Sequence, residues 1–243
     1  MKPCFKASIA VVLSTLSFAT ESTALEKRSA PATDRVSEWN AGSDCLLRYY
    51  NICTGWIWVW SGWPDDSRLG VVFDGGSCAD DTALLSSTVF VATGVPPGYG
   101  FTGTIDVHAI DANLCPTGAP IASQPFVPSS GFQLVVWPGV PVPDDFAIVV
   151  TVQTPEQSGV FPGSFGTDHP AAGPTGPQAC GVCYPANRPN RSFAYGSASS
   201  PICPGSVFND GLCDAQLVWD ATVIPSGIAV QSSSWGSIKS LYR

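Results

Sequence analysis

The sequence has 243 residues and a net charge of −8 at pH 7. Because only 11 of its residues are lysine or arginine, the chain lacks the basic surface by which proteins bind nucleic acids or anionic membranes, and we expect neither as a partner. Its 24 glycines, 22 prolines and 12% charged residues, spread among apolar runs, are typical of a loop-rich extracellular β protein rather than a disordered chain.

The first 24 residues have the features of a secretory signal peptide. Lys2 and Lys6 supply a positive region, residues 7–18 carry no charge, and small residues follow at the expected cleavage point. The apolar run is too short to span a bilayer, so no membrane span is predicted. We therefore expect residues 1–24 to be removed on export, and residues 25–44 to form a polar leader ahead of the folded domain.

Export also bears on the cysteines, because an even number in a secreted chain favours disulfides. Removal of Cys4 with the signal peptide leaves eight of the nine. The cysteines expected in disulfides are Cys45, Cys53, Cys78, Cys115, Cys180, Cys183, Cys203 and Cys213. Spacing suggests one pair between Cys45 and Cys53 and another between Cys78 and Cys115, with the last four paired among themselves; other connectivities stay open.

Residues 54–63 form the most aromatic stretch, with four of the eight tryptophans. In a strand, Trp56, Trp58 and Trp60 project from one face. Indoles two residues apart lie about 6.6–6.8 Å from each other, a spacing on which sugar rings stack. These tryptophans are therefore candidate ligand-binding residues, although a core strand has the same pattern and is favoured. Trp63, at the end of the strand, is expected to be the exposed one.

Further short strands follow in chain order, bounded by turn residues. They are predicted over residues 68–74, 88–93, 104–111, 132–137, 146–152, 193–196 and 215–223. No internal segment has a helical period, and residues 155–189, rich in proline and glycine, are expected to form a long loop. This pattern predicts an all-β fold, a single antiparallel β-sandwich of jelly-roll type, over residues 45–230.

The strand predicted over residues 104–111 has a polar face. Thr104, Asp106 and His108 project from one side, while Ile105 and its alternate neighbours project from the other. Such a face either lines a polar binding groove or is the ordinary solvent side of a sandwich strand. The second interpretation is favoured, and Asp106 and His108 are retained as candidate ligand-binding residues.

No catalytic motif is present, and no catalytic residue is predicted. Asp168 and His169 form the one local acid–imidazole pair, but they lie in the predicted loop, where a catalytic triad lacks support. Cys180 and Cys183 have the spacing of a redox or zinc motif. A zinc ribbon needs a second close pair, and Pro185 interrupts the helix that a redox motif requires, so disulfides are favoured.

No metal site and no cofactor are predicted. Paired aspartates in turns offer the oxygen ligands that calcium prefers. These doublets are Asp65–Asp66, Asp80–Asp81 and Asp144–Asp145. None matches a complete calcium loop, so ordinary solvated turns are favoured and structural calcium is the alternative.

Residues 231–243 differ from the rest and are predicted to form a tail or short helix. Trp235, Ile238 and Tyr242 fall on one helical face, and Ser234 is a suitable N-cap. We expect this segment to dock on the sandwich; the alternative is a recognition tail for export or attachment.

Several segments resemble uncharacterised secreted bacterial β-sandwich proteins of jelly-roll type. The segments that carry this resemblance are Gly70–Asp74, Ile105–Ala109 and Pro116–Pro120. The ending Trp235–Arg243 is similar to a tail on such exported proteins. The resemblance implies export and a sandwich fold, and it carries no catalytic residues.

Three functions are consistent with these features. The favoured one is a secreted, non-catalytic protein that binds or adheres, with an extracellular glycan or another cell-surface component as partner. The first alternative is an extracellular glycan hydrolase with two aspartates across a cleft. The second is a structural envelope or extracellular component without a small ligand. Exposed coplanar tryptophans favour binding, facing carboxylates favour hydrolysis, and buried tryptophans without a groove favour the structural role.

Overall fold

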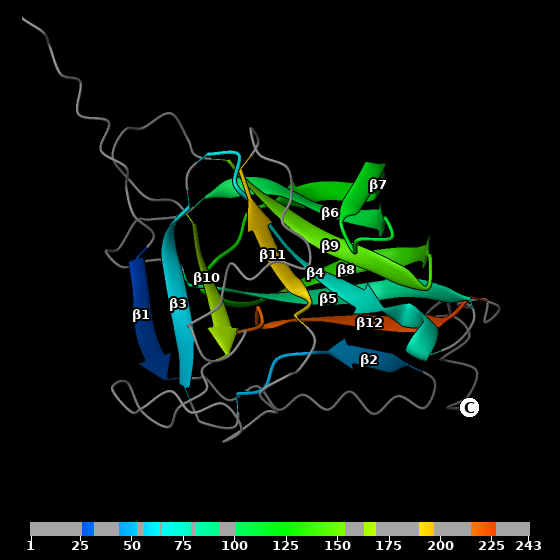
Figure 1. The fold of residues 1–243 in the computed structure, drawn as a ribbon, viewed down its shortest axis with the longest axis horizontal. Coiled ribbons are helices and arrows are strands. Elements are labelled where there is room, and N and C mark those ends of the chain that lie inside the picture. The colour runs from blue at the N-terminus through cyan, green and yellow to red at the C-terminus, as the bar shows by residue number, and fades with distance from the viewer. Residues whose placement is uncertain are drawn as a thin grey trace, which may run out of the picture.

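The fold is an antiparallel β-sandwich (Figure 1). The computed structural model describes residues 26–31, 44–52, 56–63, 65–78, 81–92, 101–153, 163–168, 190–196 and 215–226. In these ranges the one helical element is the 3-10 turn η1 (Gly75–Ser77). The described part of the chain has no helix that is long and apolar enough to cross a membrane. The predicted all-β sandwich is confirmed.

Seven strands form one sheet, here called sheet A, in the order β1-β3-β10-β5-β12-β2, and β8 also pairs with β5. Its strands are β1 (Glu26–Pro31), β2 (Cys45–Arg48), β3 (Trp56–Trp63), β5 (Thr82–Val91), β8 (Gly131–Val142), β10 (Gly163–Asp168) and β12 (Trp219–Pro225). Five strands form sheet B in the order β11-β4-β9-β6-β7. They are β4 (Arg68–Asp74), β6 (Thr102–Ile110), β7 (Pro116–Phe126), β9 (Asp145–Gln153) and β11 (Ser192–Tyr195).

The strand order has jelly-roll topology. Between β3 and β10 every connection crosses from one sheet to the other except the β6–β7 connection. As a result β3-β10-β5-β8 in sheet A faces β4-β9-β6-β7 in sheet B, as the two four-stranded halves of a jelly roll do. Of the remaining strands, β1 pairs with β3 and β11 pairs with β4 at the edges of these halves, whereas β12 pairs with β5 and in turn with β2.

Strand β9 shows how the sequence sets the layers. β9 lies between β4 and β6 in sheet B, and its side chains are buried on both faces of the sheet. Phe146 and Ile148 project into the core between the sheets. Ala147 and Val149 project from the opposite face and contact Phe193 of β11 in a second apolar cluster. The uniformly apolar run over residues 146–152 is therefore a central strand, as a sequence without polar alternation indicates.

Part of the segment expected to be a leader is a strand of sheet A. Residues 26–31 form β1, which pairs antiparallel with β3 from Glu26 opposite Ser61 to Pro31 opposite Trp56. The segment is polar and has no β-alternation, so its strand conformation comes from pairing with the edge of sheet A rather than from its own sequence.

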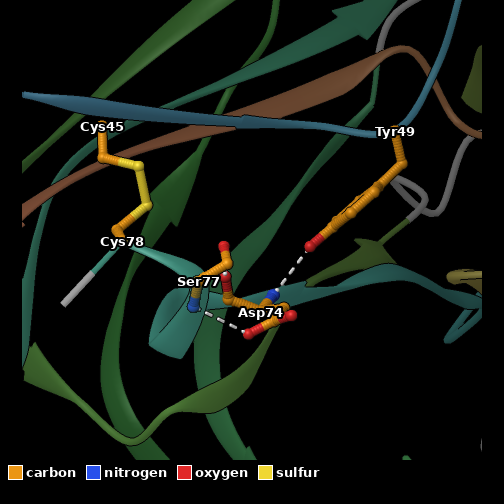
Figure 2. Close-up of a disulfide and its surroundings, with 5 residues drawn as sticks. All are labelled: Cys45, Tyr49, Asp74, Ser77 and Cys78. Atoms are coloured by element: carbon orange, nitrogen blue, oxygen red, sulfur yellow. Dashed lines mark hydrogen bonds between the residues drawn. A yellow bond between two sulfur atoms is a disulfide. The ribbon is translucent and has the colours of Figure 1, made fainter. Parts of the chain in front are cut away.

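A disulfide among the described residues ties sheet A to the connection between the two sheets. Cys45 on β2 is bonded to Cys78, just after η1, with their Cα atoms 6.0 Å apart (Figure 2). The predicted pairing of Cys45 with Cys53 and of Cys78 with Cys115 is therefore wrong. Spacing along the chain misled the prediction, because the jelly-roll topology brings β2 of sheet A next to the turn that ends β4 of sheet B. The cysteines at 53, 180, 183, 203 and 213 lie outside the described residues.

A hydrogen bond reinforces this connection between the sheets. The hydroxyl oxygen of Tyr49, which follows β2, accepts the backbone N–H of Asp74 at 2.8 Å (Figure 2). The Asp74 carboxylate in turn accepts the N–H of Ser77 at 3.1 Å and so caps η1. Burial of the Tyr49 ring raises the pKa of its hydroxyl above 10, so the neutral phenol is retained across the physiological range. The disulfide and Tyr49 thus hold β2 against the end of β4.

Two buried threonines are expected to respond oppositely to the same substitution. The Thr82 hydroxyl is buried and has no hydrogen-bond partner among the described residues, so Thr82→Val should raise the free energy of unfolding by about 1 kcal/mol. The buried Thr167 hydroxyl accepts the indole N–H of Trp60 at 2.9 Å, so Thr167→Val should lower the free energy of unfolding by about 1–2 kcal/mol. Urea unfolding of both variants measures these changes in the free energy of unfolding. An equal decrease in the two variants would contradict an unpartnered Thr82 hydroxyl beside a hydrogen-bonded Thr167 hydroxyl.

Candidate functional site

The tryptophans of β3 do not form a flat binding surface. Trp58 is only 2% exposed and belongs to the core between the sheets. The half-buried Trp60 ring meets it edge-on, with centroids 6.2 Å apart and an interplanar angle of 88°. The core position favoured for Trp58 is confirmed. The side chain of Trp56 lies outside the part of the structure that is described.

The prediction that Trp63 is exposed is wrong. Its side chain is 5% exposed and packs in the main core. Ser164 of β10 pairs with Ser61, and Gly163 pairs with Trp63, so Gly62 has no partner on β10. This extra residue is a β-bulge, which shifts the following side chain to the other face of the strand. Trp63 therefore points inward, where strict alternation would turn it away from the core.

A polar row crosses the outer face of sheet B, the face turned away from the core. Tyr195 of β11 pairs with Arg68 of β4, Arg68 pairs with Thr151 of β9, and Thr151 pairs with Thr104 of β6. Because neighbouring strands lie about 4.8 Å apart, this Arg68 row is about 14 Å long. The Arg68 side chain is exposed, Tyr195 and Thr104 are half-buried, and Thr151 is nearly buried.

The two polar residues predicted on β6 lie next to this row. Asp106 is 8% exposed, and its Oδ2 atom accepts the hydroxyl of Thr104 at 3.0 Å. His108, the next residue on the same face, is half-buried. Asp106 and His108 are thus brought together with Thr104 on the outer face of sheet B, and Asp106 is a buried acceptor rather than a freely solvated carboxylate.

His108 carries an unsatisfied polar atom. Its Nδ1 is buried and has no hydrogen-bond partner among the described residues. Burial lowers the pKa of His108 below the ordinary value of 6.5, and the charge of Arg68 lowers it further, whereas Asp106 opposes the shift. The imidazole is therefore neutral at pH 7. Because the Nδ1 atom is buried, it is not accessible to a ligand in this conformation.

The His108 titration tests this environment. Because the fold favours the neutral ring, its contribution to stability is present above pH 6.5 and is lost as the pH falls through that value toward the lowered pKa. In NMR spectra the chain should give two histidine titrations, and the one removed by His108→Asn should have a midpoint below 6.5. A midpoint at or above 6.5 would show that His108 is solvated or paired with Asp106.

Tyr195 and Arg68 form the aromatic end of the row. The Arg68 guanidinium carbon lies 5.8 Å from the centre of the Tyr195 ring. The ring itself stacks on Phe193, with centroids 6.0 Å apart and an interplanar angle of 26°. Phe193 is fully buried and lies over Gly70, where a Cβ atom would overlap it. The buried Phe193 thus fixes the Tyr195 ring, and the Tyr195 ring supports the exposed guanidinium.

Arg68 also differs from the other arginines whose side chains are described. Arg48 pairs with Asp220 at 3.3 Å, and Arg191 pairs with Asp145 at 3.6 Å. In the described part of the chain, Arg68 forms no ion pair with a carboxylate. Its donors are therefore directed to solvent or to a ligand.

Sequence reasoning missed Arg68 and Tyr195. The segment containing Tyr195 gave only a weak strand signal, and Arg68 stands at the first position of β4. Arg68 and Tyr195 share a cross-strand row with Thr104 only because four strands from distant parts of the chain pair side by side in sheet B. Local alternation indicates which side chains share a face within one strand, but it does not give the order of the strands.

Two other acidic groups have structural partners. Asp74 and Asp145 lie opposite each other where β4 and β9 meet, which places two carboxylates close together. The Asp74 side chain caps η1, however, and the Asp145 side chain forms the ion pair with Arg191. Over the described ranges, no three histidine, cysteine or acidic side chains come together as a metal-binding group. His169 lies outside the described residues, as do the tail residues 231–243.

No family model matches the sequence. No curated protein matches it either. The chain is similar in fold to the crystal structure of the cysteine protease and lectin-like domains of Cwp84, a surface layer associated protein of Clostridium difficile, with a TM-score of 0.51 and 15% identity over 76% of this chain and 36% of that chain. It is also similar to a variant of the same protease after propeptide cleavage, with a TM-score of 0.50 and 14% identity over 76% of this chain and 41% of that chain. The chain thus spans less than half the length of these proteins, and the likeness concerns the fold alone.

Proposed function

We propose that the protein is a secreted, non-catalytic β-sandwich protein that binds carbohydrate on the outer face of sheet B. The observation that carries the proposal is the Arg68 row, in which a supported aromatic ring and a guanidinium without a carboxylate partner in the described chain lie beside threonine hydroxyls. The buried tryptophans of β3 do not contribute to this site.

The chemistry of the row suits a sugar. A pyranose presents an apolar face to an aromatic ring, and Tyr195 is half-buried with its ring held by Phe193. Sugar hydroxyls need both donors and acceptors at the edge of the ring. Arg68 supplies donors, Thr104 supplies a hydroxyl, and Asp106 is an acceptor on the same face.

An extracellular location, which would suit this function, is part of the proposal. The disulfide between Cys45 and Cys78 ties β2 to the turn between β4 and β5, and such bonds persist in oxidising compartments. The signal peptide expected over residues 1–24 would direct the protein to export. One of the structures of similar fold comes from a surface-associated protein that carries a lectin-like domain. A glycan or a cell-surface component is therefore the partner that we propose.

The charges of the site support binding over hydrolysis. A glycoside hydrolase needs two carboxyl groups on either side of the scissile bond. Beside the described part of the Arg68 row, Asp106 supplies the one carboxylate, and it is already bonded to Thr104. Asp74 and Asp145, the pair that does face each other, are held in a cap and an ion pair. We therefore propose carbohydrate binding as the function and keep glycan hydrolysis as the alternative.

A glycan array on the oxidised protein tests the proposal. Tyr195→Ala and Arg68→Ala should each weaken binding to any glycan hit by about tenfold, because each removes part of the stacking or donor surface. Thr117→Ala, at an exposed position on β7, is the matched control and should bind as the unmodified protein does.

Two outcomes would count against carbohydrate binding at this face. The first is that the oxidised protein binds no glycan, which would favour a structural extracellular component, a role that the burial of Trp58 and Trp63 also suits. The second is that a glycan binds with equal affinity to both variants and the control, which would move the site elsewhere on the molecule.

A further inference from the structure

Arg68 is the one charged side chain of the Arg68 row, and it is exposed. Over the described ranges it forms no ion pair, either with Asp65 and Asp66, which lie just before it in the chain, or with Asp106 on the same face. A guanidinium keeps its proton throughout the physiological pH range. The row therefore presents a fixed positive charge to solvent beside Tyr195.

The Tyr195 ring holds this charge over the outer face of sheet B. The Arg68 guanidinium carbon lies 5.8 Å from the centre of the ring, and the ring is itself stacked on the buried Phe193. The charge also reaches β6, two strands away, where it contributes to the lowered pKa of His108. The field of Arg68 thus covers the same face on which the threonine hydroxyls lie.

The β6 end of the row presents a neutral acceptor. The Thr104 hydroxyl donates its hydrogen to the Asp106 carboxylate at 3.0 Å, so toward a ligand its oxygen offers lone pairs. Thr104 and Arg68 are two strand spacings apart, about 10 Å. A ligand that lies along the row therefore meets a cation at one end and an acceptor for a hydroxyl group at the other.

A single arginine on an acidic chain favours a ligand with one negative charge at this point. The sequence has a net charge of −8, and polyanions bind to series of basic residues, which this row lacks. A carboxylate carries one charge, and a guanidinium binds it with two parallel hydrogen bonds. Repulsion from more distant acidic residues is screened over about 8 Å at physiological ionic strength, so the contact with Arg68 decides the specificity.

We propose that the Arg68 row selects acidic glycans, whose sugar carboxylate binds the Arg68 guanidinium. The ring of the acidic sugar lies against Tyr195, and a hydroxyl group farther along the glycan donates to Thr104. This inference rests on the carbohydrate binding proposed above and names the class of glycan that the site takes.

An array of paired glycans tests this specificity on the oxidised full chain. It carries glycans of glucuronic, galacturonic and sialic acid, each beside its methyl ester, together with neutral and sulfated glycans. At least one carboxylated glycan should bind, and its methyl ester should bind about tenfold more weakly, because esterification removes the charge that Arg68 binds.

Two arginine variants locate the preference. Arg68→Gln keeps amide donors but removes the charge, so it should bind the acidic glycan as weakly as the ester. Arg48→Gln is the matched control, because it removes the same charge from the outer face of sheet A, and it should keep the tenfold preference. Thermal unfolding shows whether each variant is folded.

The other outcomes separate this inference from the function on which it rests. Equal binding of acid and ester that is weakened by Tyr195→Ala would support carbohydrate binding at this face and overturn the acidic specificity. A preference that persists in the folded Arg68→Gln variant, or binding of sulfated glycans alone, would also overturn it. If no glycan of any class binds, both proposals are wrong.

Discussion

Alanine at position 103 is expected to prevent the sandwich from folding stably. Gly103 lies on β6 between its partners Val152 on β9 and Phe126 on β7. A Cβ atom at this position would overlap the backbone carbonyl oxygen of Thr151. Because that oxygen belongs to a central strand, relief of the overlap requires the two strands to separate.

The expected loss is more than about 4 kcal/mol, a large part of the stability of an ordinary domain. Urea unfolding and the yield of soluble protein measure it. Gly76→Ala is the matched control, because the nearest atom to its added Cβ is a side-chain atom of Asp144 at 3.3 Å, and Gly76 is exposed in a turn. A Gly103→Ala protein as stable as the control would contradict the close approach of β6 and β9.

Asp168→Ala is expected to give the second large loss of stability. Asp168 ends β10 and is fully buried. Its Oδ1 atom accepts the N–H of Gln216 at 2.8 Å, and its Oδ2 atom accepts the N–H of Asn51 at 2.9 Å. One carboxylate thus joins β10 to the residues that follow β2 and to those that precede β12.

The same hydrogen-bond network continues through Gln216. Its Oε1 atom accepts the Ser192 hydroxyl at 2.9 Å and the N–H of Arg191 at 3.1 Å, and the Ser192 oxygen accepts the N–H of Leu217 at 2.9 Å. Ser192 belongs to β11 of sheet B. The network therefore connects the two sheets at the end of the sandwich where β10 and the segment before β12 meet.

Alanine at position 168 would leave two backbone donors without their acceptor, and we expect a loss of about 3 kcal/mol in the free energy of unfolding. Asp168→Asn keeps one acceptor atom and should lose about half as much. Urea unfolding at constant pH compares the two. Equal stability of the alanine variant and the unmodified protein would mean that water replaces the carboxylate.

The fold was predictable where the sequence pattern is unambiguous over a whole strand. The apolar run over residues 146–152 marks a central strand, and the alternation from Thr104 to His108 correctly places Asp106 and His108 on one face. Features set by contacts between distant segments were not predictable. β1 takes its conformation from the edge of β3, and Cys45 reaches Cys78 only because the chain crosses between the sheets.

The candidate site was predictable only in part for the same reason. Asp106 and His108 carry a local signal, whereas Arg68 and Tyr195 join them through pairing across β11, β4, β9 and β6. Trp63 was predicted to be exposed and is buried. One extra residue at Gly62 reverses the face of the strand on which its side chain lies. A period-two pattern cannot anticipate a bulge whose position depends on the partner strand.

The most direct test of carbohydrate binding is a crystal structure of the oxidised protein with a glycan identified on the array. We expect a sugar ring against Tyr195, with its hydroxyl groups or substituents bonded to Arg68 and to the Thr104–Asp106 pair. A sugar bound on sheet A, or at the tryptophans of β3, with the outer face of sheet B empty, would contradict the account.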